Sequence, residues 1–398
     1  MGIKATFAAS IFAVCVLWGC SSSAPVAQLP DSRAEAIKEL ETRGTSRTPD
    51  EFVKAIRSGE DQLVVLFLKA GMDPNLRTSN RGLLDLTPLH WALMTDHSAI
   101  AKTLLDYGAD PMIWATNPPS PAFHLTISRS KDLALRIIES GVPIDVPDGV
   151  GRTPLFYAAR DDNLDIARVL IDKGANINTK DVIGATILIG ALRNGQPEAA
   201  KLLLEKGASI EEGGYSPLVL AAERGYRDIA KILLARGADF RRPSLSGDTA
   251  LRAATRNGHR ELAEFLIELG ADVNQGQPIL GAAFRNDLEM VKLLLGKGAD
   301  VNAIDKTGRS ALRMVARDEY EEMMRLLLAH GANVNLPTIY GETSLMLAAE
   351  SGHEKTIRLL LAHGADIHAK DKNGKTAFDY AKGRPHVRQL LIDHGARP

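Results

Sequence analysis

Three histidines recur at one position of the sequence and are the first candidates for metal chemistry. His330, His363 and His394 each directly precede a glycine, at spacings of 33 and 31 residues. A zinc ion needs imidazole nitrogens at about 2 Å, whereas equivalent positions on stacked helices stand about 8 to 10 Å apart. Because one ion cannot bridge two of these rings, we interpret them as polar side chains near the C-termini of helices.

Other reactive groupings are missing from the sequence. It contains no phosphate-binding glycine loop, no HExxH and no GxSxG. Its two cysteines, Cys15 and Cys20, both lie near the N-terminus, which excludes disulfides and Cys-x-x-Cys zinc sites from the rest of the chain. The net charge of −1 gives no reason to expect nucleic acid as a partner. We therefore predict no enzymatic activity, no cofactor, no metal and no small-molecule substrate.

Short polar residues and further histidines recur at fixed positions and favour structural roles. His90, His259 and His353 are expected to form hydrogen bonds between neighbouring turns and helices. An Asp or Asn follows a Gly-Ala pair seven times, and a side chain there can accept from nearby backbone amides. The neighbouring loops lack the clustered carboxylates of a calcium site. These seven residues are Asp110, Asn176, Asp239, Asp272, Asp300, Asn333 and Asp366.

The elements that position these residues follow from a repeat that starts near residue 48. Tails such as DKGANIN, GKGADVN and AHGANVN recur, and six of the ten intervals between the tail glycines are 33 residues long. A matching head lies upstream of each tail, clearest as TPLHWAL at 87–93, TPLFYAA at 153–159 and TSLMLAA at 343–349. A period of this length indicates one supersecondary unit that is stacked many times.

Head, tail and period together resemble the ankyrin repeat, a β-turn followed by two antiparallel helices. The resemblance implies an all-α fold: an α-solenoid of about eleven helix-turn-helix units with β-hairpin fingers, covering residues 48–398 and capped at both ends. It also implies protein binding in a concave groove. The polar residues Asp50, Glu51 and Lys54 are expected where the first unit faces water.

One unit illustrates the expected local structure. Thr153 precedes Pro154, so the threonine side chain is expected to cap a helix whose first turn holds the proline. Gly174 is expected in the left-handed conformation that ends the second helix. Two connections are shorter than the others, ASIEEGGYSP at 208–217 and ADVNQGQP at 271–278, and should notch one wall of the groove. The connection before Leu89 is four residues longer and contains Leu83 and Leu84.

The N-terminal residues indicate a targeting segment. Lys4 precedes an uncharged apolar run that is too short to span a bilayer comfortably. Its end, Leu17-Trp18-Gly19-Cys20, resembles a bacterial lipoprotein signal, although Trp18 is larger than that pattern normally holds. The resemblance implies a signal peptide at 1–19, acylation of Cys20 and, because Ser21 is not aspartate, an outer-membrane location facing the periplasm. The alternative is ordinary cleavage further on, after Ala24, without a lipid.

Residues 20–47 then form a lipid-anchored tether and a short helix, which Asp31 would cap and which runs through Arg43. The partners expected from the whole sequence are unidentified proteins, together with a membrane reached through the lipid on Cys20. The function predicted is a non-enzymatic interaction scaffold on the cell envelope. The alternative is a secreted effector that binds host or competitor proteins through the same groove.

Large side chains gather in the second to fifth units and are candidates for contact with a partner, since tryptophan, tyrosine, methionine and arginine are frequent at interface centres. The alternative is that they only pad neighbouring helices. The candidates are Trp91, Met94, Trp114, Tyr157, Arg160 and Arg193.

Overall fold

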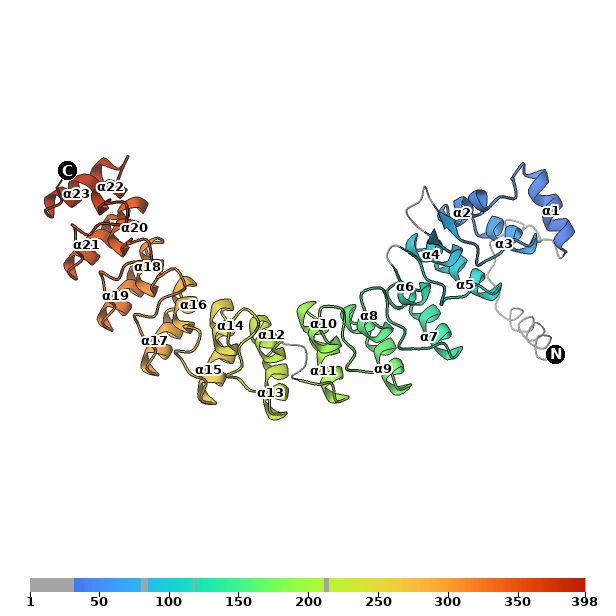
Figure 1. The fold of residues 1–398 in the computed structure, drawn as a ribbon, viewed down its shortest axis with the longest axis horizontal. Coiled ribbons are helices and arrows are strands. Elements are labelled where there is room, and N and C mark those ends of the chain that lie inside the picture. The colour runs from blue at the N-terminus through green and yellow to red at the C-terminus, as the bar shows by residue number, and fades with distance from the viewer. Residues whose placement is uncertain (1–31, 80–84, 117–118, 211–214, 398) are drawn as a thin grey trace, which may run out of the picture. The chain divides into compact units, whose positions relative to one another are not determined.

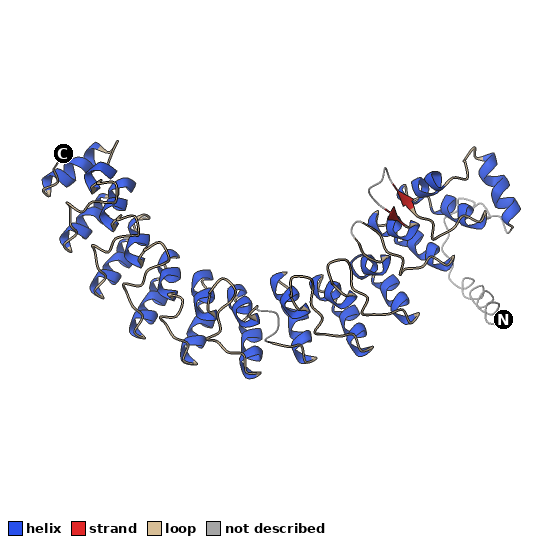
Figure 2. Ribbon diagram, in the orientation of Figure 1, coloured by secondary structure: helices blue, strands red, loops and turns tan. Residues whose placement is uncertain are grey.

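A computed structural model gives the structure of the chain and describes residues 32–79, 85–116, 119–210 and 215–397. The chain divides into two compact units, residues 1–110 and 111–398. The predicted lipidation residue Cys20 and the predicted helix cap Asp31 lie outside the described residues, as do Leu83 and Leu84. In the described residues eleven helix pairs follow one additional helix, and the chain is almost entirely helical (Figures 1 and 2).

The first unit holds the additional helix, two helix pairs and one short strand pair among its described residues. The two strands pair antiparallel, with Thr78 opposite Leu86. The elements are α1 (Arg33–Thr42), α2 (Pro49–Arg57), α3 (Asp61–Lys69), β1 (Thr78–Ser79), β2 (Asp85–Leu86), α4 (Pro88–Met94) and α5 (Ser98–Asp106).

Helix α1 packs on the first helix pair. The hydroxyl of Ser32 accepts from the amide of Glu35 and the Glu35 carboxylate accepts from the amide of Ser32, so Ser32 is the cap and the prediction of Asp31 was wrong. Ala36 and Leu40 are fully buried, and Arg33 Nε donates to the carbonyl of Ala70 at 3.2 Å. Helix α1 therefore covers α3, and its apolar side chains belong to the core of the first unit.

The second unit stacks nine helix pairs, and the first helices of these pairs form one row (Figure 1). Each first helix packs on the first helix of the next pair, so the row is continuous. These helices are α6 (Ala122–Arg129), α8 (Pro154–Arg160), α10 (Ile187–Arg193), α12 (Pro217–Arg224), α14 (Ala250–Asn257), α16 (Pro278–Phe284), α18 (Ala311–Ala316), α20 (Ser344–Ser351) and α22 (Ala377–Tyr380).

The second helices form a parallel row on the outer side of the first (Figure 2). None of the helices in the described part of the chain is both long and apolar enough to cross a membrane. The second helices are α7 (Lys131–Glu139), α9 (Leu164–Asp172), α11 (Pro197–Glu205), α13 (Arg227–Ala235), α15 (Arg260–Glu268), α17 (Leu288–Gly296), α19 (Glu321–Ala329), α21 (Glu354–Ala362) and α23 (Pro385–Asp393).

Helix starts and ends follow largely from the repeated head and tail. Threonine or serine precedes most first helices; Thr186 and Thr343 each accept a hydrogen bond from the amide three residues on, as a cap does. At Thr153 the predicted capping bond is absent, because its hydroxyl instead lies 3.4 Å from the hydroxyl of Thr179. Gly174 has φ +91° and ends α9 in the predicted left-handed conformation.

Small residues let the first helices approach one another. Ala158 and Ala159 are fully buried between neighbours. A Cβ on Gly281 of α16 would lie 2.9 Å from the Cα of Arg256 on α14, so any larger residue forces these two helices apart. Glycine is therefore required at position 281 by close packing, since its own backbone is ordinary helix.

The connections between helix pairs, which we call fingers, form turns more than regular hairpins. Besides β1 and β2, the described fingers contain only isolated bridges, such as Lys180 with Thr186 and Ile304 with Ser310. We number each finger by the pair that it precedes, counting the α2–α3 pair as the first. Fingers 6 (207–216) and 8 (270–277) are short, whereas fingers 5 (174–186), 7 (237–249), 9 (298–310), 10 (331–343) and 11 (364–376) have full length.

Candidate protein-binding groove

The face formed by the first helices and fingers of the second unit contains two hollows. One has a volume of about 540 Å³ and is lined by α14, α16 and α18, with finger 9. The other has a volume of about 730 Å³ and is lined by α12 and α14, with finger 7 and the end of finger 6. They lie where fingers 6 and 8 are short. Arg256 lines both hollows, so they adjoin, and we call them together the central groove.

Arginine dominates the polar lining of the central groove. Seven arginines line the two hollows, against four carboxylates and no lysine. The arginines are Arg193, Arg224, Arg252, Arg256, Arg309, Arg313 and Arg317, and the carboxylates are Glu223, Asp248, Asp305 and Asp318. Glu342 does not line either hollow but forms an ion pair with Arg313. Counting Glu342 with the four lining carboxylates leaves an excess of two positive charges, in a chain whose net charge is −1.

Most of these arginines are held in place by carboxylates. Buried Asp248 receives Arg252 Nη1 at one oxygen and Arg256 Nη1 at the other, both at 2.9 Å. This fixes two guanidinium groups at the junction of the two hollows. Arg193, Arg224 and Arg317, by contrast, form no ion pair with any described residue. Arg224 Nη2 donates to the carbonyl of Arg193 at 2.6 Å, and Arg193 lies 5.5 Å from the ring centre of Tyr215. Their charges are available to a partner.

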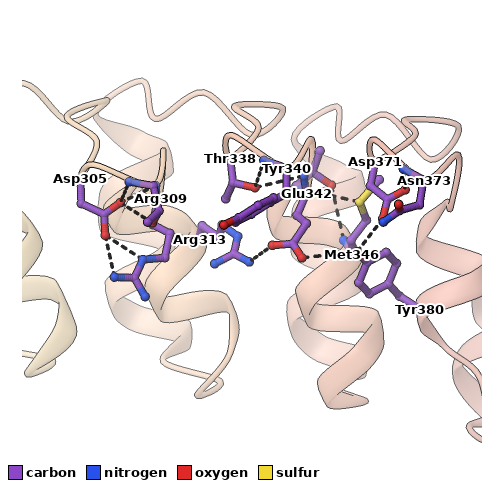
Figure 3. A network of polar contacts seen from close by, with 12 residues as sticks. Asp305, Arg309, Arg313, Thr338, Tyr340, Glu342, Met346, Asp371, Asn373 and Tyr380 are labelled. Carbon is purple, nitrogen blue, oxygen red and sulfur yellow. Dashed lines mark hydrogen bonds and ion pairs between the residues drawn. The ribbon is translucent and has the colours of Figure 1, made fainter.

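A polar network fixes the C-terminal side of the groove (Figure 3). Arg309 donates to Asp305 at 2.7 Å within finger 9, and Arg313 Nη2 donates to Glu342 of finger 10 at 2.6 Å. The hydroxyl of Tyr380 on α22 donates to Asp371 of finger 11 at 2.9 Å. Each bond joins a finger either to itself or to a first helix, so the network makes this wall rigid.

Two groups in this network have shifted pKa values. Burial alone would raise the pKa of Asp305, but hydrogen bonds from the Thr307 hydroxyl and from Arg309 lower it to about 2. Burial, together with the hydrogen bond to Asp371, raises the pKa of Tyr380. Asp305 is therefore an anion at any physiological pH, and Tyr380 stays a neutral donor.

Two large apolar side chains stand exposed beside the groove. Phe284 at the end of α16 is 68% exposed, and Leu245 at the tip of finger 7 is 71% exposed. Phe284 lines the first hollow and Leu245 the second. Exposed aromatic and aliphatic side chains in a concave, arginine-lined surface match the composition of protein-binding sites.

The short fingers explain why the hollows are open. Full-length neighbouring fingers are joined by backbone hydrogen bonds, from Val182 N to Val150 O at 2.9 Å and from Ile339 N to Thr307 O at 3.0 Å. Lys372 N likewise donates to Tyr340 O at 2.9 Å. No backbone bond joins finger 7 to the described residues of its short neighbours, fingers 6 and 8. Fingers 7 and 8 are joined through side chains alone, as by Gln275 Nε2 donating to the Arg241 carbonyl at 3.1 Å, so the backbone bonding along the wall is interrupted on either side of finger 7.

The six residues predicted from the sequence fall in both units. In the first unit, Trp91 is buried and donates from Nε1 to the Thr78 hydroxyl at 3.0 Å, under the guanidinium of Arg57. Met94 is 40% exposed. The remaining four, Trp114, Tyr157, Arg160 and Arg193, lie in the second unit. The assignment of the six to one binding site stays a prediction.

Within the second unit, Tyr157 and Arg160 serve contacts inside the fold. The Tyr157 hydroxyl donates to Asp148, and burial followed by this bond raises the tyrosine pKa to about 12. Arg160 lies 4.6 Å from the Tyr157 ring centre and donates twice to Asp161. Trp114 is half-exposed. Of the predicted residues only Arg193 lines the central groove.

A buried histidine lies beside this tyrosine. The ring of His124 is 5.4 Å from that of Tyr157, and its Nε2 bonds to the carbonyl of Val146 at 2.9 Å. Its Nδ1 has no partner among the described residues, and burial lowers its pKa. A neutral ring of this kind fills space between α6 and α8.

The histidine column and the Gly-Ala-Asx residues have the predicted structural roles. Nδ1 of His330, His363 and His394 each bonds to the carbonyl four residues earlier at 2.8 Å, at the C-terminus of its helix. The side chains of Asn176, Asp239, Asp272, Asp300, Asn333 and Asp366 each accept from the amide two residues on. His259 and His353 bond to carbonyls of the preceding pair, whereas His90 bonds to Thr87 in its own turn. No metal-ligating cluster occurs among the described residues.

A further series of bonds between neighbouring pairs was not predicted. The amide of Asn335 donates from Nδ2 to Gly364 O at 3.0 Å and accepts at Oδ1 from Asp366 N at 2.7 Å. Asn302 forms the same pair of bonds with Gly331 and Asn333. The signal in the sequence was asparagine at the second position after the Asx residue, which occurs in four of the seven tails, as Asn178, Asn274, Asn302 and Asn335.

Comparison with known proteins assigns the chain to a family. A model described as Ankyrin repeats (3 copies) matches residues 123–213, 210–277 and 279–371, and a model described as Ankyrin repeat matches residues 85–115. The matches cover more than half of the chain. The chain belongs to the ankyrin-repeat family. The fold prediction of an all-α ankyrin solenoid is confirmed, and ankyrin repeats of this kind support protein–protein interaction.

One curated relative is similar to part of this chain. A putative palmitoyltransferase, ZDHHC13 of Danio rerio, is 36% identical over 80 residues, which is 20% of this chain and 12% of that protein. The chain therefore spans a small part of the length of this relative. The enzymatic activity in its name is a property of that protein.

Proposed function

We propose that this ankyrin-repeat chain is a non-enzymatic scaffold of the bacterial cell envelope, anchored by a lipid on Cys20 and binding a protein partner in the central groove. The observation that carries the groove assignment is the open, arginine-lined surface with Phe284 exposed at its edge. The proposal includes no cofactor and no small-molecule substrate, since the sequence contains no phosphate-binding glycine loop, no HExxH and no GxSxG.

The groove half of the proposal is tested by photo-crosslinking in cells. A photoreactive phenylalanine analogue at Phe284 is expected to trap one predominant protein, identified by mass spectrometry. The matched control places the same analogue at Leu269, a similarly apolar residue at the end of α15 that is 45% exposed on the second-helix row. Equal crosslinking at both positions, or none at Phe284, would contradict binding in the groove.

The anchor half is tested at the N-terminus. The resemblance of Leu17–Cys20 to a lipoprotein signal supports acylation of Cys20, and several acyl chains hold a protein firmly on a bilayer. Mass spectrometry of the mature chain is expected to find an acylated Cys20 as its first residue. Cys20→Ala should release the chain from the membrane fraction. An unmodified N-terminus after Ala24 would favour secretion without a lipid.

A further inference from the structure

Finger 7 stands between the two hollows of the central groove. Its neighbours are the short fingers 6 and 8, and its tip residue Leu245 is 71% exposed. Arg256 connects the two hollows below it. A chain laid along the groove must therefore pass finger 7 and meets an exposed apolar side chain in each hollow, Leu245 in one and Phe284 in the other.

Three of the lining arginines form no ion pair with a described residue: Arg193 and Arg224 at one end of this path, and Arg317 at the other. Arg193 is at the end of α10 and Arg317 directly follows α18, four helix pairs further on. Stacked helices are spaced by about 8 to 10 Å, so the path is about 32 to 40 Å long. An extended peptide rises by about 3.3 Å per residue and covers this length with about 10 to 12 residues.

Charge selects the partner. The lining with its paired Glu342 carries an excess of two positive charges, and the guanidinium groups that form no ion pair stand at its ends. Binding a carboxylate to Arg193 or Arg317 breaks no existing ion pair, whereas Arg309 and Arg313 would first have to leave Asp305 and Glu342. Planar guanidinium groups of this kind bind carboxylates through paired hydrogen bonds.

From this arrangement we infer that the central groove receives an extended acidic segment of about 10 to 12 residues from a partner protein, with carboxylates at Arg193 and Arg317 and apolar side chains against Leu245 and Phe284. This inference rests on the proposed function, because it names the kind of partner that the groove accepts. It places the contact in helix pairs five to nine of the array.

The experiment uses the purified full chain and a display library of random 12-residue peptides. Selected peptides are expected to be enriched in Asp and Glu together with Leu, Phe or Met, and depleted of Lys and Arg. The tightest peptide is then synthesised with a fluorescent label and its affinity measured by anisotropy. Raising the salt concentration should weaken binding, since exposed charges contribute to it.

Variants locate the site. Arg193→Glu and Arg317→Glu are each expected to weaken binding of the labelled peptide by about tenfold or more, and Leu245→Ser or Phe284→Ser by a similar factor. The charge-matched control is Arg358→Glu on α21, where Arg358 is exposed and forms no ion pair or side-chain hydrogen bond with a described residue. The apolar control is Leu269→Ser. Both controls should bind within about twofold of the unmodified chain.

Several outcomes would overturn the inference. Selection of basic or neutral peptides would contradict the charge argument, as would equal binding by the groove and control variants. The inference would also fail if acidic peptides did not bind, while a single-stranded oligonucleotide or a phosphatidylglycerol vesicle bound and lost affinity in the same groove variants. If Phe284 crosslinked one protein but the selected peptides were not acidic, binding in the groove would stand and this inference alone would fail.

Discussion

Arg313 on α18 reaches across to the next helix pair and donates from Nη2 to the Glu342 carboxylate of finger 10 at 2.6 Å. The side chains are only 12% and 29% exposed, so this pair ties a first helix to the neighbouring finger in a partly dehydrated setting. The Tyr380 hydroxyl lies 3.4 Å from the other Glu342 oxygen, which extends the connection to the last pair.

This pair should contribute measurably to stability. Glu342→Ala leaves the Arg313 charge without its partner, and we expect it to lower the free energy of unfolding by about 1 to 3 kcal/mol. In a double-mutant cycle with Arg313→Ala, chemical denaturation should give a coupling of about 1 kcal/mol or more. The exposed pair Lys292–Glu289 is the control and should couple by less than about 0.5 kcal/mol. Equal couplings would contradict the role of burial.

The ionisation of Asp305 should make stability depend on acid pH. Its pKa is about 2 in the folded chain, compared with about 3.9 for an unfolded aspartate. Because the folded value is the lower one, its contribution is present above pH 4 and is lost as the pH falls from about 4 to 2. Asp305→Asn should therefore cost about 1 to 2 kcal/mol at pH 7, and the difference from the unmodified chain should shrink toward pH 2. A difference independent of pH would refute this assignment.

Two glycine-to-alanine substitutions should have opposite effects on stability. Gly281→Ala puts a Cβ 2.9 Å from the Arg256 backbone and should destabilise by about 1 to 3 kcal/mol, because two first helices must separate. Gly296→Ala lies in α17, where a Cβ meets nothing within 4 Å, and should stabilise by up to about 1 kcal/mol through helix propensity. Thermal unfolding of both variants distinguishes packing from propensity; destabilisation by both would point to a different cause.

Helix α1 should be needed for the stability of the first helix pair. Leu40→Ala removes a fully buried side chain and is expected to cost about 2 to 4 kcal/mol. Since repeat arrays lose stability locally, hydrogen exchange should accelerate most in α1, α2 and α3. Lys38→Ala, exposed on the same helix, is the control. Unchanged exchange in α3 after Leu40→Ala would mean that α1 does not support it.

The repeat made most of the fold predictable, because each unit reproduces the same heads, tails and glycines. Gly174 and the histidine column behave as local rules require. Asn335 was missed because its two bonds reach the following unit, and only the spacing of stacked units in space brings its amide to Gly364 and Asp366. Periodicity shows that a residue recurs, but it does not show to which neighbouring unit the side chain forms its hydrogen bonds.

The candidate site was less predictable. Residue type alone favoured Trp91 and Tyr157, yet Trp91 bonds to Thr78 and Tyr157 to Asp148, and neither partner is evident from the sequence. The two short fingers were the better guide, since shortening removes part of a wall regardless of which side chains remain. Phe284, which is 68% exposed, belongs to the unit with the short finger 8.

The interruption of the finger bonds also determines where the array accepts new sequence. Between fingers 4 and 5 an insertion at Val182 would break its bond to Val150 and disturb two units together. An insertion between Leu245 and Ser246 meets no such bond among the described residues. The tip of finger 7 is therefore a natural place to graft a foreign loop, because a longer tip breaks no backbone bond to a neighbouring finger among the described residues.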